Sequence, residues 1–150
     1  MKDAIGSTML FYLIVIVVGI IGSIIISSNA YTKAYKAKNA IITIIDKYYK
    51  IQKAECDNYK NCTDDIDTAL TNLGYKMSGD NTCNNLDVKN AELIYPKENG
   101  TFNGYCIFAH NLGNGDKYYT VVTFSHLNVS LVGTLFKKPV YGETRVYNYS

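Results

Sequence analysis

The longest apolar segment of the chain lies at residues 9–26 and reads MLFYLIVIVVGIIGSIII, without a charged residue. The nearest charges are Asp3 before it and Lys33 after it. At 1.5 Å per residue, a helix of 18 residues is about 27 Å long, which is enough to cross the core of a bilayer. A segment this apolar on every side is typical of a membrane span. The pattern therefore predicts a transmembrane helix at residues 9–28, behind a short stub at residues 1–8.

The helical pattern continues beyond the apolar run. Residues 31–56 contain no Gly or Pro, and their apolar positions recur every three or four residues, as on one face of an α-helix. Lysines occupy much of the remaining surface, so residues 29–55 are predicted to extend the same helix as an amphipathic segment. Coiled-coil partners or other subunits would suit its apolar face, but the segment is short for a coiled coil and a domain follows it, which favours packing on the chain's own sheet. The predicted helix-packing residues are Ala34, Ala37, Ile41, Ile44, Tyr48 and Ile51, with Ile41, Ile44 and Ile51 in the core. Ile42, Ile45 and Tyr49 widen this stripe.

A second, shorter helix is expected at the start of the domain formed by residues 56–150. Thr63 is a candidate cap, and Asp64 and Asp65 would lie in the first turn, where the helix dipole favours anions. Gly74 is a candidate for the residue that ends this helix.

The rest of the domain is rich in β-branched and aromatic residues, which favour strands. Strands are expected at residues 91–95, 104–111, 118–129, 134–137 and 143–149. Asn114-Gly115 predicts a hairpin, and Pro139 and Gly142 are expected to separate the last two strands. The predicted fold class is α+β, with the long N-terminal helix packed on a small antiparallel sheet of three to five strands.

The domain also contains all four cysteines of the chain, Cys56, Cys62, Cys83 and Cys106. An even number of cysteines beyond a membrane anchor indicates two disulfides in an oxidising compartment, whereas four reduced thiols in a cytosolic domain are the alternative. Their spacing matches no zinc pattern. Three pairings are possible, and the local one, Cys56 with Cys62 and Cys83 with Cys106, is the favoured expectation.

The lysines that follow the apolar run bear on which side of the membrane the domain lies. Residues 33–53 contain six lysines and one acid, Asp46. Counting lysines alone would place the C-terminal side in the cytoplasm, whereas the cysteines favour a single-pass protein with an extracytoplasmic domain, which is the reading adopted. The basic segment suits anionic lipid head groups, although a solvated helix face accounts for it equally well. Nucleic-acid binding is not expected.

Candidate catalytic or metal-ligating chemistry is sparse. His110 and His126 lie in expected strands without an acid at a telling spacing, and no nucleophile elbow or phosphate loop occurs. Asp64, Asp65 and Asp67 are better explained as helix charges than as calcium ligands. The sequence therefore predicts a non-enzymatic protein without a cofactor or metal.

Within the apolar run, Gly19 and Ser23 are four residues apart, so they lie on one face of the helix. Small residues at this spacing allow two helices to approach closely in lipid. A self-association face is expected there. The fourteen tyrosines of the chain suit polar protein–protein contacts elsewhere.

Together, the short stub MKDAIG at residues 1–6, the apolar run, the amphipathic stalk and the disulfide-bearing sheet resemble type IV pilin-like proteins, above all the tight-adherence minor pseudopilins (TadE-like). Residues 131–145, LVGTLFKKPVYGETR, also look like the end of such proteins. The resemblance implies cleavage after Gly6, which would leave Ser7 as the new N-terminus. The family has a glutamate where this chain has Phe11, and that departure points to a minor or initiating subunit or to an uncleaved relative.

The resemblance implies a membrane-anchored subunit of a pilus or secretion pseudopilus, with membrane lipids, other pilin-like subunits and the assembly machinery as partners. A single-pass receptor or ligand-binding module is the alternative. Ser28-Asn-Ala30 also resembles a signal-peptide cleavage site, but the apolar run is longer than the roughly 7–15 residues usual for such peptides.

Overall fold

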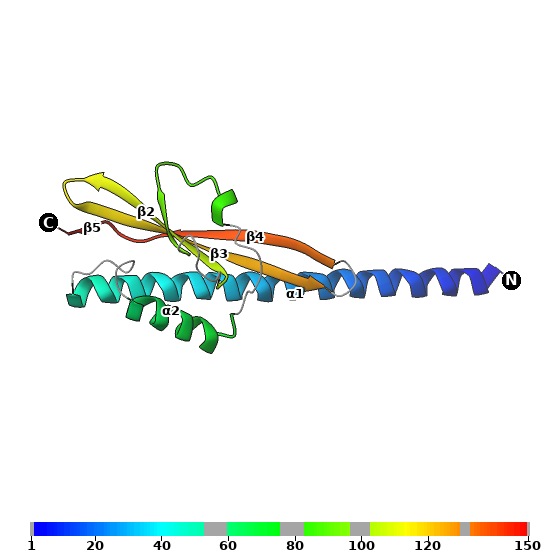
Figure 1. Cartoon of the computed structure of the whole chain (residues 1–150). Coiled ribbons are helices and arrows are strands. Elements are labelled where there is room, and N and C mark those ends of the chain that lie inside the picture. Colours follow the sequence, from blue (N-terminus) through cyan, green and yellow to red (C-terminus); the bar gives the residue numbers. More distant parts are fainter. Residues whose placement is uncertain (1, 53–59, 76–82, 97–102, 130–132, 150) are drawn as a thin grey trace.

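The computed structural model describes residues 2–52, 60–75, 83–96, 103–129 and 133–149. Its elements are α1 (Lys2–Gln52), α2 (Lys60–Asn72), the short 3-10 helix η2 (Cys83–Asn85), β1 (Glu92–Tyr95), β2 (Tyr105–Gly113), β3 (Asp116–Val129), β4 (Gly133–Glu143) and β5 (Tyr147–Asn148). The strands form one antiparallel sheet in the order β1-β2-β3-β4, and β5 also pairs with β3. The predicted α+β class is confirmed: the sheet and α2 lie along the C-terminal part of α1, whose N-terminal part extends beyond them (Figure 1).

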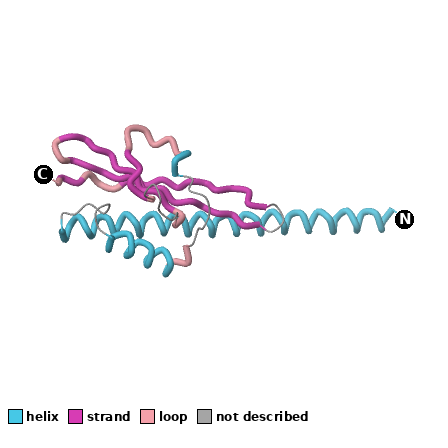
Figure 2. The backbone as a smooth tube through the Cα atoms, in the orientation of Figure 1, coloured by secondary structure: helices cyan, strands magenta, loops and turns pink. Residues whose placement is uncertain are grey.

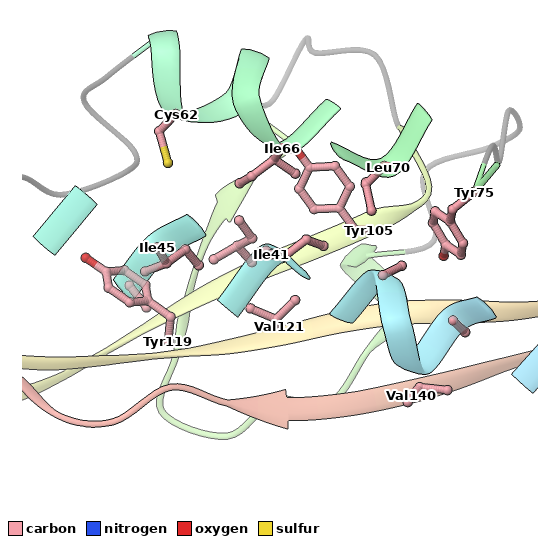
Figure 3. Close-up of a cluster of buried hydrophobic side chains, with 14 of the residues drawn as sticks. Ile41, Ile45, Cys62, Ile66, Leu70, Tyr75, Tyr105, Tyr119, Val121 and Val140 are labelled. Atoms are coloured by element: carbon pink, nitrogen blue, oxygen red, sulfur yellow. The ribbon is translucent and has the colours of Figure 1, made fainter. Parts of the chain in front are cut away.

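Small side chains let α1 approach the sheet closely. Ala34 and Ala37 are fully buried, and Ile41 and Ile45 continue the same face one and two turns later. The hydroxyl of Thr123 on β3 donates a 2.9 Å hydrogen bond to the backbone carbonyl of Ala34. These residues belong to one core in which α1, α2 and the sheet meet (Figure 3).

The buried face of α1 corrects part of the expected helix-packing stripe. Ile51 is 67% exposed, and Ile44 and Tyr48 are only partly buried, while Ile45 is 2% exposed. The reason is that the expected stripe repeats every 3.5 residues, whereas a straight helix turns by about 100° per residue. On that geometry Ile45 lies about 20° around the helix from Ala34, and Ile51 lies about 100° away.

A second apolar cluster covers the opposite face of the sheet. Phe108 on β2, Val122 and Phe124 on β3, and the disulfide-bonded Cys83 and Cys106 form its buried part. Residues 83–93 run across this face, beyond the sheet as seen from α1 (Figure 2). The sheet is thus covered on both faces, by helices on one and by a short tethered segment on the other.

The last strands differ from expectation, because β4 continues through both Pro139 and Gly142. β4 is the last strand on its side of the described sheet order, and proline is tolerated in edge strands. Gly142 packs against the side chain of Lys38 on α1, which a Cβ at this position would meet. The strand thus continues through Gly142 and does not end there.

The interruption between β4 and β5 instead falls at residues 144–146. The backbone N–H of Tyr119 donates to the Thr144 hydroxyl at 3.0 Å, and the Thr144 N–H donates to the Tyr119 carbonyl at 2.9 Å. Thr144 thus bonds to both the backbone N–H and the backbone carbonyl of Tyr119. Its side-chain hydroxyl takes the place of one backbone acceptor. β5 then resumes pairing with β3 at Lys117.

α2 begins at Lys60, so Thr63 lies inside the helix and the expectation that it caps the helix is wrong. The earlier start places Cys62, Ile66 and Leu70 one turn apart on a single buried face. The end agrees with expectation: Gly74 has a φ of 64°, and the N–H groups of Gly74 and Tyr75 donate to carbonyls of the last turn in a Schellman motif. The hairpin expected at Asn114-Gly115 is also present, with φ values of 54° and 80°.

The corrected core makes a direct comparison possible between Ile45→Ala and Ile51→Ala. Removing the buried Ile45 side chain is expected to lower the free energy of unfolding by about 2–5 kcal/mol, because a cavity remains. The same change at the exposed Ile51 is expected to alter it by less than about 0.5 kcal/mol. Urea unfolding of the full chain in detergent, followed by near-ultraviolet circular dichroism, measures both. Equal losses would place the core elsewhere.

Candidate functional site

The N-terminal half of α1 is the largest exposed apolar surface among the described residues. Its large side chains from Met9 to Ile26 are 44–73% exposed, and none of the most apolar 18-residue window is buried. The mean hydropathy of that window is 3.0, so α1 is long and apolar enough to cross a membrane. A contiguous apolar surface of this size marks a membrane or protein contact.

The predicted small-residue face lies within this exposed half. Apart from the adjacent residues and the backbone of α1 itself, no atom lies within 4 Å of the point where a Cβ on Gly19 would stand, and the same holds for Gly22. The hydroxyl of Ser23 donates a 2.9 Å hydrogen bond to the Gly19 carbonyl, so its polar group is satisfied within the helix. Gly6 and Ser7, the possible processing site, are part of α1 near its N-terminus.

Aromatic and basic side chains follow directly after the apolar run. Tyr31 and Tyr35 are 54% and 47% exposed, and Lys33 and Lys36 are exposed as well. The ammonium of Lys38 lies 4.2 Å from the centre of the Tyr35 ring. Tyrosine and lysine are the residues enriched where a membrane span meets the head groups.

The far end of the stalk is fastened to the C-terminal segment by an ionic and aromatic cluster. The Asp46 carboxylate accepts a hydrogen bond from the Tyr147 hydroxyl and lies 3.3 Å from the Arg145 guanidinium. The Tyr49 hydroxyl donates to the Asn148 carbonyl at 2.8 Å, and its ring lies 4.5 Å from that of Tyr147. Burial, followed by the hydrogen bond to Asp46, raises the pKa of Tyr147.

Sequence reasoning missed this cluster, although one signal was available. Asp46 is the only acid in a stretch of six lysines and lies next to the buried face of the helix. A half-buried carboxylate needs a hydrogen-bond donor or a cation, and Arg145 and Tyr147 provide them from a segment that is a hundred residues away in sequence.

A second polar cluster attaches α2 to the sheet. The Asp67 carboxylate accepts hydrogen bonds from the Asn103 amide at 2.8 Å and from the Tyr105 hydroxyl at 3.3 Å. The rings of Tyr105 and Tyr95 are stacked with their centres 4.5 Å apart. Burial raises the pKa of Asp67, although both hydrogen bonds act in the opposite direction.

Tyr75 fixes the end of α2 between two strands. Its hydroxyl accepts a 2.8 Å hydrogen bond from the Phe124 N–H and lies 2.7 Å from the Gly104 carbonyl, to which it donates. Burial raises the pKa of Tyr75 to about 12. The hydroxyl thus links a backbone carbonyl just before β2 to a backbone N–H of β3.

The cysteines and histidines lie apart from these clusters. Cys83 is bonded to Cys106, the local pairing expected from the sequence, and Cys62 is buried and disulfide-bonded, whereas Cys56 lies outside the described residues. His110 is buried on the outer face of the sheet, where its Nε2 lies 2.9 Å from the Thr120 hydroxyl and its ring stacks on Tyr118.

His126 lies in β3, paired with Lys137 of β4. Over the described part of the chain, no three His, Cys, Asp or Glu side chains come together in a group that could hold a metal ion. The residues that the structure does bring together therefore fasten helices to the sheet.

No protein-family model, curated protein or solved structure matches this chain. The protein presents a long helix with an exposed apolar half, a basic and aromatic junction, and a domain whose sheet is covered on both faces.

The raised pKa of Tyr75 predicts a loss of stability at alkaline pH. The folded state holds the Tyr75 proton up to about pH 12, and the unfolded state releases it near pH 10, so this stabilisation is complete below pH 10 and is lost as the pH rises toward 12. Between pH 9 and 11, Tyr75 alone should account for a fall of about 1 kcal/mol in the free energy of unfolding.

Urea unfolding at both pH values, on the native chain and on Tyr75→Phe, measures this contribution. The variant should be less stable at neutral pH, because the hydrogen bonds of the Tyr75 hydroxyl to the Phe124 N–H and the Gly104 carbonyl are lost, and its stability should fall less between pH 9 and 11. Tyr141→Phe, at a half-exposed position on β4, controls for the loss of a tyrosine hydroxyl as such. An unchanged pH dependence in Tyr75→Phe would contradict the assignment.

Proposed function

We propose that this protein is a membrane-anchored, non-enzymatic subunit of a pilus or pseudopilus-type assembly. The observation that carries the proposal is the division of α1 into two functional halves without a break in the helix. The large apolar side chains of residues 9–26 are exposed and take no part in the described cores of the domain, whereas residues 34–45 contribute to the core beneath the sheet. A force applied to the anchor is therefore transmitted directly to the domain.

The proposed mechanism is assembly through the apolar half of α1. In the membrane this half is covered by lipid, and in an assembly it is covered by the corresponding helices of neighbouring subunits. Gly19 lets another helix come close, because nothing projects from it and the Ser23 hydroxyl is already satisfied. Exchange of lipid for protein contacts then requires no change in the fold of the domain.

The disulfide supports an extracytoplasmic domain. Cys83 and Cys106 are bonded and buried, and disulfides persist in oxidising compartments. The lysines after the apolar run favour the opposite orientation by charge counting, but they equally suit the anionic head groups beside which they would lie.

A test of the assembly mechanism is the double substitution Gly19→Leu with Ser23→Leu. Two leucines would keep the span apolar and helical but fill the proposed contact face. The expected result is loss of co-purifying partner subunits when the tagged protein is extracted from its native membranes with mild detergent. Ile21→Leu with Ile25→Leu, on another face of the same span, is the matched control and should retain the partners. Unchanged complexes in the Gly19 and Ser23 variant would contradict helix packing through this face.

The alternative function, a tethered receptor or ligand-binding module, is favoured by one observation. The domain has a core on each face of its sheet and uses none of residues 9–26 to build them. Replacing residues 1–28 by an unrelated membrane span separates the two functions: an assembly subunit would lose its partners, whereas a tethered binder would keep its ligand. Intact-mass analysis of the extracted protein adds a further check, since cleavage after Ala30 would remove the apolar half and contradict both.

A further inference from the structure

The end of the β3–β4 hairpin extends along α1 toward its N-terminus (Figure 1). Two contacts fix the relative direction of β3 and α1. Near the start of β3, Lys117 pairs with Tyr147, which donates a hydrogen bond to Asp46 of α1. Further along β3, Thr123 donates to the Ala34 carbonyl. β3 therefore runs antiparallel to α1.

The same contacts show which residue of α1 lies level with the end of β3. Between them, six residues of β3 run beside twelve residues of α1, which agrees with rises of about 3.3 Å per strand residue and 1.5 Å per helix residue. β3 continues for six more residues, to Val129. At this rate its end is level with about residue 22 of α1, inside the apolar run at residues 9–26.

The charge pattern of the sequence around the ends of β3 and β4 agrees with a position beside the apolar run of α1. Residues 127–136 read LNVSLVGTLF and contain no charged residue, and Lys137 and Lys138 follow immediately. Lys138 is exposed and pairs with Ser125, two residues beyond Thr123, which places it level with about residue 30 of α1. The hairpin therefore changes from charge-free to basic at the same height at which α1 changes from its apolar run to the segment with Tyr31 and Lys33.

We infer that the neighbouring ends of β3 and β4, at Val129 and Gly133, enter the interfacial layer of the bilayer beside α1, so that the protein contacts lipid through this strand pair as well as through α1. The inference rests on the membrane anchoring proposed for α1. Lipid is the occupant that the charge pattern favours, because both elements are free of charge below one level and carry lysines above it, where anionic head groups would lie.

The expected depth is that of an interfacial element and not of a second span. Residue 22 lies about 6 Å below the end of the apolar run at Ile26, and amphipathic elements bury their apolar side about 5–10 Å into the head-group boundary. Open sheet edges do not occur in the hydrocarbon core, where their backbone groups would lack partners. A shallow position lets water and head groups satisfy the free edge of β4.

The absence of tryptophan from the chain makes this inference directly testable. Leu135→Trp and Phe136→Trp each place a single fluorophore on β4, at successive residues of the strand, and successive positions of a strand sample both of its faces. The full-length variants are reconstituted in vesicles of phosphatidylcholine and phosphatidylglycerol, with and without bromine on the acyl chains. Phe11→Trp in the apolar run is the reporter for the anchor. Leu112→Trp, exposed near the end of β2 and close to the start of β3, is the reporter for water.

The expected result is that brominated lipid removes most of the emission of Phe11→Trp and of at least one β4 variant, and leaves Leu112→Trp unchanged. A quenched anchor with both β4 variants unquenched would overturn this inference alone. An unquenched Phe11→Trp would contradict the anchoring on which the proposed function rests. If both β4 variants were shielded from brominated lipid and from acrylamide alike, a protein partner would occupy the hairpin end and the lipid contact would be wrong. Formation of the Cys83–Cys106 disulfide, identified by non-reducing peptide mapping, shows that each variant has kept the native bond.

Discussion

The close packing of α1 on β3 is the interaction on which the rest of the structure depends. Ala34 and Ala37 leave room for the sheet to approach the helix backbone, and the Thr123 hydroxyl bonds to a carbonyl of the helix itself. Because this contact lies in the middle of a 51-residue helix, it fixes the domain to the C-terminal half of α1 and leaves the N-terminal half exposed. Both the proposed anchoring and the reach of the β3–β4 hairpin follow from where this contact falls along α1.

The sequence predicted the elements whose signals are local. The apolar run, the continuity of the helix without Gly or Pro, the Asn114-Gly115 hairpin and the closing role of Gly74 each depend on neighbouring residues, and the structure has them. The continuation of β4 through Pro139 and Gly142 depends instead on its pairing with β3 and on its position at the end of the described sheet order, which no local rule could show. The exposure of Ile51 depended on a small difference in helical period, which grows with each turn.

In the candidate site, too, features set by neighbouring residues could be predicted and features set by distant residues could not. The exposed Gly19 and Ser23 could be placed on one helix face from their spacing alone. The cluster of Asp46, Arg145 and Tyr147 could not, because it joins the end of the stalk to the end of the chain. An isolated acid on a basic helix indicated that a partner was needed, but not which residue would supply it. Such long-range pairs hold the domain in one position along α1, which a stalk that transmits position to an assembly requires.

The central claim is that α1 is one uninterrupted helix, apolar and exposed in its first half and part of the domain core in its second. Amide hydrogen exchange of the full-length protein in lipid nanodiscs tests this most directly, because it reports on each part of the backbone across the junction at residues 27–33. Continuous slow exchange from the apolar run through Ile45 is the predicted result. Fast exchange confined to residues 27–33 would reveal a hinge between two separate helices, and would contradict the account.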